Sequence, residues 1–150
     1  MTVVKGLSDE PAPLPALVGF VFGRVRVVLD EEDWGGLRQS HIRVLSSVPN
    51  EGVSVTALAD RVRMTKQGAG QFVGWLADRG YLTVSPDPTD RRVRVVRRTP
   101  TGTRVLRRFA RRMQDLETEW ADQVGHARYA QFREVLVDLA QGESERQGFS

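Results

Sequence analysis

Apolar residues recur at steps of three and four positions along most of the chain, which is the spacing of helices that bury one face. This spacing predicts helices over about residues 14–33, 39–48, 55–62, 66–79 and 101–124, followed by a last helix that ends near 140. Between Tyr81 and Val96 the apolar positions alternate instead, and the turn-forming run PDPTD separates two strands of a β-hairpin. Residues 1–13 carry little pattern and are expected to form a flexible leader. We therefore predict a mostly α-helical chain with one small hairpin.

The helices predicted near the two ends of the chain carry extensive apolar surface. The first is apolar on most of its sides, and such a helix is usually buried, so we expect another subunit to cover it. The helix over 101–124 has a coiled-coil-like seam that is expected to pack on a partner helix. In the last helix, the inward residues are expected to be Phe132, Val135, Leu136 and Leu139.

Residues 54–80 have the features of two short amphipathic helices in tandem. Ser54 and Thr65 stand where N-cap residues would begin each helix. Arg63 and Met64 make a tight connection, and Gly80 lies where a glycine would end the second helix. Two such helices form a helix-turn-helix, and a hairpin directly after it makes a winged helix.

The glycines in the run MTKQGAGQFVGWLADRG, residues 64–80, first resemble a nucleotide-binding loop. A dinucleotide fingerprint needs G-x-G-x-x-G directly after a buried strand. Here the third glycine comes one position late, at 74, and the preceding segment is an amphipathic helix. A phosphate-binding P-loop is disfavoured as well, because no Gly-Lys-Ser/Thr sequence follows.

A helical wheel explains the same glycines better. The face opposite the apolar residues of this helix consists of Gln67, Gly68, Gly70, Gln71 and Gly74. If that face enters a major groove, the glutamines can pair with adenine N6 and N7, and the missing side chains let the backbone approach DNA closely. Each glycine costs about 0.8–1 kcal/mol relative to alanine in a helix interior. The alternative is a surface helix that the glycines only make flexible.

The predicted hairpin, PDPTDRRVRVVRR, places Asp90, Arg91 and Arg92 at or beside its tip. An arginine on a thin wing can enter a minor groove, where narrow A·T tracts concentrate negative potential. We expect Asp90 to orient a neighbouring arginine by a charge-assisted hydrogen bond. In the second strand, over 92–96, Val93 and Val95 are expected on one face and Arg92 and Arg94 on the other. The alternative is a solvated, charged hairpin.

The distribution of charge supports nucleic-acid binding. Residues 60–112 hold 14 Lys and Arg against 4 Asp and Glu, a balance of +10. The rest holds 8 basic and 15 acidic residues, a balance of −7, and the two sum to the net charge of +3. A basic middle between acidic ends is the footprint of a nucleic-acid binder, although a solvated arginine-rich surface would give the same count.

Composition excludes several other classes of protein. A chain of 150 residues is long enough for one domain with a real core. The absence of cysteine excludes disulfides, cysteine metal sites and thiol redox sensing. No nucleophile–base pair or metal constellation stands out, so we expect neither an enzyme nor a cofactor. Arg24 and Arg26 interrupt the apolar run that follows Leu14, which favours a cytoplasmic protein over a membrane protein. As a DNA binder, it would be nucleoid-associated.

Taken together, these motifs resemble the MarR family of transcriptional regulators. The resemblance runs through LRQSHIRVL, VTALADRVRMTKQGAGQFVGWLADRGYL, PDPTDRR and TPTG, of which the PDPTDRR wing is the most specific part. It implies a winged helix-turn-helix with N- and C-terminal dimerisation helices. The implied organisation is a single subunit over 14–150, with the DNA-binding part at about 37–100 and the dimerisation helices at about 14–33 and 101–140.

The resemblance also implies a set of DNA contacts. Groove, phosphate and wing contacts are expected from Thr65, Lys66, Gln67, Gly68, Gly70, Gln71, Asp90, Arg91, Arg92 and Arg94. This chain departs from the family pattern in two ways. Arg98 stands where leucine is usual before Thr99, and Gly70 and Gly74 replace larger residues. The packing at the base of the wing and the extent of side-chain readout are therefore open.

The implied function is that of a homodimeric repressor that binds a pseudo-palindromic operator and is released by a small, aromatic or phenolic effector. Residues near the corresponding effector region are Phe20, Trp34, His41 and Arg43. His41 also fits a polar residue at the start of a helix. The alternative function is a winged-helix module that binds an acidic protein, or DNA in an architectural role, without an effector.

Overall fold

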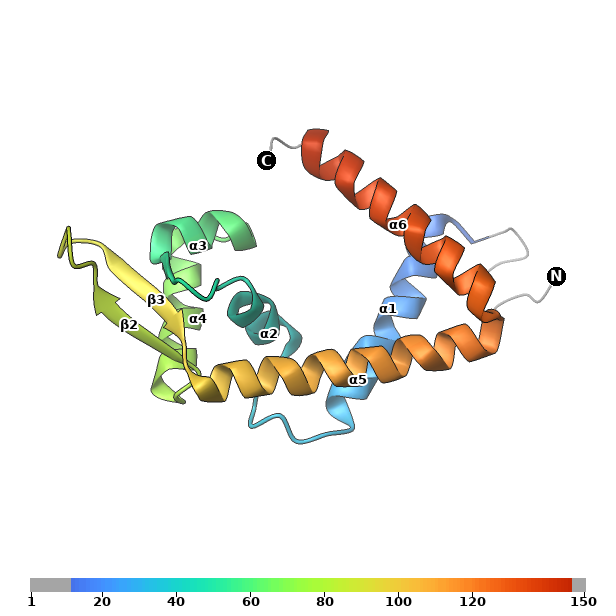
Figure 1. The fold of residues 1–150 in the computed structure, drawn as a ribbon, viewed down its shortest axis with the longest axis horizontal. Coiled ribbons are helices and arrows are strands. Elements are labelled where there is room, and N and C mark those ends of the chain that lie inside the picture. The colour runs from blue at the N-terminus through green and yellow to red at the C-terminus, as the bar shows by residue number, and fades with distance from the viewer. Residues whose placement is uncertain (1–11, 147–150) are drawn as a thin grey trace. The chain divides into compact units, whose positions relative to one another are not determined.

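The computed structural model describes residues 12–146, which form six helices and three strands (Figure 1). The first half of the described chain contains α1 (Leu14–Asp30), α2 (Gln39–Ser46), β1 (Val53–Ser54), α3 (Val55–Val62) and α4 (Lys66–Asp78). The second half contains β2 (Leu82–Pro86), β3 (Arg94–Arg98), α5 (Pro100–Val124) and α6 (His126–Arg146). The leader expected over 1–13 lies almost wholly outside the described residues.

The chain divides into two compact units, residues 1–109 and 110–150, and helix α5 is continuous from one to the other. In the first unit, α2, α3, α4 and the sheet bury the apolar stripes that the sequence predicts. The side chains with almost no exposed surface include Val44, Leu45, Val48, Leu58, Val62, Leu76, Leu82 and Val96. This core is what holds the helix-turn-helix and the wing together.

The predicted caps of α3 and α4 are confirmed. Ser54 Oγ accepts the backbone N–H of Ala57 at 3.1 Å, and Thr65 Oγ1 accepts that of Gly68 at 3.0 Å. Between the helices, Arg63 adopts a left-handed conformation with φ of 53°, which makes the tight connection. These caps satisfy backbone donors that a helix leaves unpaired at its start.

Helix α4 ends at Gly80 as predicted. Gly80 has a φ of 77°, and its N–H donates to the carbonyl of Ala77 at 2.9 Å. The N–H of Tyr81 donates to the carbonyl of Leu76, also at 2.9 Å. This pair of bonds is a Schellman motif, which needs a residue that tolerates positive φ. It turns the chain directly into β2.

The sheet has the order β1-β3-β2, with both neighbours antiparallel to β3. The hairpin is confirmed, but the predicted second strand over 92–96 is wrong by two residues, because β3 begins at Arg94. Val95 and Val96 are both buried, so the expected alternation is also wrong. β3 is the central strand of the sheet and pairs on its second edge with β1, a strand that the alternation did not predict.

The run TPTG joins the wing to α5 through a close backbone contact. Thr99 Oγ1 donates to the carbonyl of Gly80 at 2.6 Å and accepts the N–H of Gly102 at 3.0 Å. A Cβ at position 102 would lie 2.2 Å from the carbonyl oxygen of Tyr81, so only glycine fits there. Thr99 thus caps α5 while fixing its start against the end of α4.

In the second unit, Tyr129 and Arg133 of α6 both contact the Glu117 carboxylate of α5, at 3.1 and 3.3 Å. None of the described residues of α6 is buried. The prediction that its apolar residues point inward is therefore wrong for the described chain, since Phe132, Val135, Leu136 and Leu139 are 42–56% exposed. The apolar spacing was identified correctly, but no described segment covers it.

Candidate nucleic-acid interface

The start of helix α4 presents the first group of predicted DNA contacts. Lys66, Gln67 and Gln71 are exposed, and the side-chain oxygen of Thr65 caps the helix. The N-terminus of a helix carries partial positive charge and free N–H groups, which together favour a phosphate. The arrangement can therefore hold a phosphate at its end and present two amide side chains along its outer face.

The three glycines of α4 have different surroundings. A Cβ at Gly68 would lie 3.1 Å from Thr65 Oγ1, so the N-cap itself favours glycine there. At Gly70 and Gly74 a Cβ would meet no described atom within 4 Å. Packing within the described chain therefore gives no reason for the helix to carry glycine at these two positions.

The tip of the wing is built on Asp87. Its carboxylate accepts the N–H of Thr89 at 2.7 Å, the Thr89 hydroxyl at 2.6 Å and the N–H of Asp90 at 3.2 Å. The bonds from Thr89, and then that from Asp90, hold the pKa of Asp87 below its usual value. Asp87 was not among the predicted contacts, although an aspartate between two prolines in PDPTD is a signal for such a turn.

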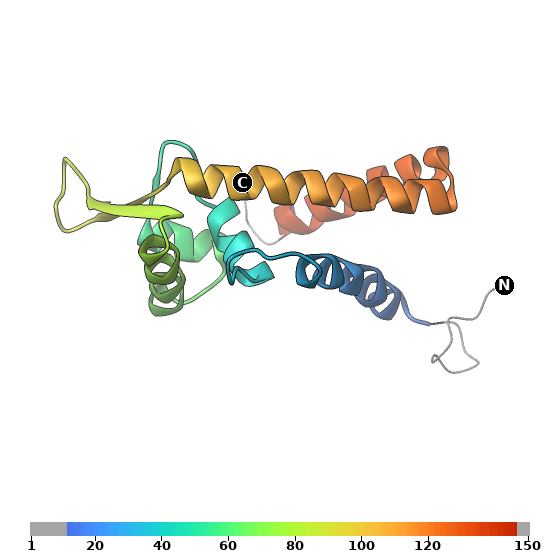
Figure 2. The ribbon, with the colours of Figure 1, turned by 90° about the horizontal axis from the view of Figure 1, so that it is seen from below.

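Asp90 does not orient an arginine side chain, so that expectation is wrong. Its carboxylate accepts the backbone N–H of Arg92 at 3.0 Å instead. A short carboxylate inside a tight turn reaches a backbone donor two residues on more easily than a distant guanidinium. The exposed side chains of Arg91, Arg92 and Arg94 form no ion pair within residues 12–146. Figures 1 and 2 show the hairpin projecting beyond α3 and α4.

The base of the wing is held by Arg98, which stands where the resemblance leads one to expect leucine. Its guanidinium donates to Asn50 Oδ1 in the turn before β1. Its Nε is buried and has no partner in the described chain. The arginine therefore joins β3 to the turn that contains Asn50, a role that its position alone did not reveal.

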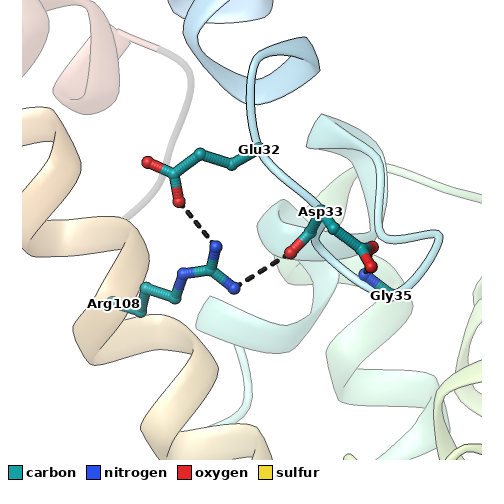
Figure 3. A network of polar contacts seen from close by, with 4 residues as sticks. All are labelled: Glu32, Asp33, Gly35 and Arg108. Carbon is teal, nitrogen blue, oxygen red and sulfur yellow. Dashed lines mark hydrogen bonds and ion pairs between the residues drawn. The ribbon is translucent and has the colours of Figure 1, made fainter.

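Among the predicted effector residues, Trp34 is buried in a polar network rather than open. The guanidinium carbon of Arg108 lies 4.3 Å from the centre of the Trp34 indole. Arg108 also donates to the Glu32 carboxylate at 2.6 Å and to the Asp33 carbonyl at 3.0 Å (Figure 3). Asp33 in turn accepts the N–H of Gly35 at 2.8 Å. This network fixes the segment between α1 and α2 on the first turns of α5.

The other three effector candidates lie apart from Trp34. Phe20 is 58% exposed on α1. Arg43 donates to the carbonyl of Val62 and so joins α2 to the end of α3. The Nδ1 of His41 accepts the N–H of Arg38 at 2.9 Å, which fits its interpretation as a residue at the start of a helix. The structure therefore does not bring these four residues together around one site.

Comparison with known proteins agrees with this geometry. The model of the MarR family matches residues 36–93, which span α2 to the wing. A search of the curated proteins finds no match to the chain. Among residues 12–146, no helix combines the length and apolar character that crossing a membrane requires.

Several solved structures share the fold at low sequence identity. The structure of MarR has a TM-score of 0.81 and 20% identity, and the match covers 97% of this chain and 100% of that one. A transcriptional regulator of the MarR family from Rhodococcus sp. RHA1 has a TM-score of 0.66 and 24% identity, with coverage of 85% and 89%.

A third match is the PcaV transcriptional regulator from Streptomyces coelicolor in complex with its natural ligand. Its TM-score is 0.65 and its identity 22%, with coverage of 94% of this chain and 98% of that one. Identities this low establish the fold alone, whereas the family model identifies the winged-helix segment itself. Residues 36–93 are thus similar to the MarR family, and the chain shares its fold with a transcriptional regulator of that family.

Proposed function

We propose that the protein is a sequence-specific, homodimeric DNA-binding repressor. The observation that carries the proposal is that the exposed outer face of α4 and the exposed side chains of Arg91, Arg92 and Arg94 belong to one unit with a common buried core. The DNA-binding part corresponds to about residues 37–100, and the helices at about 14–33 and 101–140 serve dimerisation.

The two contact surfaces read DNA in different ways. Gln67 and Gln71 face adenines in the major groove, while Lys66 and the Thr65 turn hold the adjacent phosphates. Arg91, Arg92 or Arg94 enters the neighbouring minor groove or contacts its phosphates. Asp90 contributes indirectly, because it holds the backbone from which Arg92 projects.

Gly70 and Gly74 bring the backbone of α4 close to the bases. Alanine would stabilise the helix by about 0.8–1 kcal/mol at each position, and no described atom stands in its way. A requirement for close approach by DNA accounts for glycine at both positions. In the alternative explanation, the helix is flexible until DNA binding orders it. This alternative predicts weak hydrogen-exchange protection of residues 66–79 in the free protein.

A second copy of the chain is the proposed partner of the terminal helices. Helix α6 buries none of its described residues, and the first turns of α1 expose Leu14, Val18 and Phe20. Apolar patches of this kind mark interfaces. A two-fold dimer would present two α4 helices to half-sites about one helical turn apart, roughly 10 bp, in a pseudo-palindromic operator.

Release by a small aromatic or phenolic molecule is the proposed form of regulation. PcaV, which shares the fold, was solved with its natural ligand. In this chain Phe20, Trp34, His41 and Arg43 belong to α1, α2 and the segment between them. A compound that moves this segment would move α2, on which α4 packs.

The second candidate function is a winged-helix module that binds an acidic protein or bends DNA without sequence preference. The basic stretch over 60–112 would serve either role. Selection of bound genomic fragments at about 0.15 M salt separates the two functions. The repressor proposal predicts enrichment of a few sequences over bulk DNA, and compounds can then be screened for release of those fragments. Equal retention of all fragments would favour the second function.

A further inference from the structure

His41 and Trp75 form an aromatic contact between α2 and α4, the second helix of the helix-turn-helix. The imidazole stacks on the indole with 4.1 Å between ring centres and an angle of 24°. The edge of the imidazole also faces Phe72, one turn earlier on α4, at 5.2 Å. Phe72 and Trp75 are only partly buried, and both rings contact His41.

The same imidazole is part of the N-terminal cap of α2. Its Nδ1 accepts the backbone N–H of Arg38 at 2.9 Å, in a capping box. Only an unprotonated Nδ1 can accept this bond, which assigns the proton of the neutral ring to Nε2. Protonation would turn the acceptor into a donor that faces another donor.

The charges around His41 act in the same direction. The guanidinium carbon of Arg79 lies 3.8 Å from the centre of the Trp75 indole, and Arg38 precedes α2. Burial, and then the charges of Arg38 and Arg79, lower the pKa of His41 below its ordinary value of 6.5. Phe72, Trp75 and Arg79 are the α4 residues that face the ring or its partner, and none supplies a compensating negative charge.

We infer that His41 is a positioning residue for helix α4, which it holds against α2 only as the neutral imidazole. Protonation would break the cap of α2 and add a positive charge to those of Arg38 and Arg79, which already act on the ring. The first turn of α2 and the packing of α4 on α2 would then be weakened together. The consequence for DNA binding rests on the proposed function, whereas the consequence for stability does not.

The sign of the pH dependence follows from the lowered pKa. The unfolded chain takes up a proton at His41 as the pH falls through 6.5, while the folded chain resists it. The contribution of His41 to the stability of the folded chain is therefore fully present above pH 6.5. It is lost as the pH falls from 6.5 to the pKa of the folded state. Over that window, the equilibrium constant for unfolding rises by up to tenfold for each pH unit.

The test compares His41→Gln with His126→Gln. Glutamine keeps a neutral acceptor for the N–H of Arg38 but cannot titrate. His126 is the matched control, because it is the other histidine and lies exposed on α6 beside Asp122. Urea unfolding at pH 7.5 and 5.5 should show an acid-induced loss in the wild type and in His126→Gln that is absent from His41→Gln. The histidine Cε1–H resonance that disappears in His41→Gln should titrate below 6.5.

The pH dependence of DNA affinity is the quantity that a purely structural role of His41 would leave unchanged. On a selected fragment, the affinity of the wild type should fall between pH 7.5 and 5.5, whereas that of His41→Gln should change less over the same range. A titration of His41 at or above 6.5, or the same pH dependence in His41→Gln and wild type, would overturn the inference. If no fragment is bound at all, the proposed function fails, but the unfolding and resonance measurements still decide the role of His41.

Discussion

Helix α4 buries Ala69, Val73 and Leu76, whereas helix α6 leaves Phe132 and Val135 about half exposed. Both helices have apolar residues at the same three- and four-residue steps. In α4 the apolar side lies on α2, α3 and β2, and the opposite side is open. In α6 no described residue is buried. The winged-helix unit therefore completes its own core, whereas α6 leaves its apolar side uncovered in the described chain, which supports the proposed dimer.

The largest expected effect comes from breaking the core of the winged-helix unit. Leu76 has no exposed surface, so Leu76→Ala should lower the free energy of unfolding by about 2–5 kcal/mol. If the unit is complete within one subunit, this loss should not depend on protein concentration. Urea unfolding at two concentrations a hundredfold apart provides the measurement. A loss that disappears at high concentration would mean that the unit needs its partner to fold.

The second prediction addresses the terminal helices. Val135→Asp places a charge in the apolar face of α6 and should weaken association by about 2–4 kcal/mol, with little change in the winged-helix unit. Gln141→Asp adds the same charge on the opposite side of the helix and serves as the control. Analytical ultracentrifugation of both variants distinguishes the outcomes. Dimers of equal affinity in both would exclude this face from the interface.

The third prediction tests the wing. Arg92→Ala should lower DNA affinity and reduce the magnitude of the log–log salt slope by about 0.9, because one phosphate contact is lost. Arg107→Ala, which removes an exposed arginine of α5, is the matched control for net charge. Fluorescence anisotropy at several salt concentrations measures both quantities. Unchanged binding by Arg92→Ala would remove this arginine from the mechanism.

The smallest expected effect distinguishes the two explanations of the α4 glycines. Gly74→Ala should stabilise the protein by up to about 1 kcal/mol and yet weaken DNA binding, because the new methyl group holds the helix away from the bases. Gly142→Ala, at an equally open helical position of α6, should leave DNA binding unchanged. An increase in DNA affinity with Gly74→Ala would favour the flexible-helix explanation.

Local chemistry made much of this unit predictable from sequence. Ser54, Thr65 and Gly80 act through their own backbone neighbours, so their positions alone fixed the ends of α3 and α4. The register of β3 was not predictable in the same way. It depends on the pairing of Val53 with Val96, which are 43 positions apart.

The candidate site shows the same limit. The outer face of α4 followed from the helical wheel, and the exposed arginines beside the wing tip followed from the turn-forming run PDPTD. The partners of Asp90, Arg98 and His41 did not. A hydrogen bond to Asn50 or a stack on Trp75 depends on tertiary contacts between segments that sequence spacing does not relate.

Hydroxyl-radical footprinting of a selected genomic fragment tests the central claim most directly. The account predicts two protected patches related by a two-fold axis, with centres about one helical turn apart. It also predicts that Arg92→Ala loses protection at the outer edges, where the wings would lie, and keeps it at the centres. Uniform protection along the fragment, or protection that does not change with its sequence, would contradict the assignment of α4 and the wing as a sequence-specific DNA-binding surface.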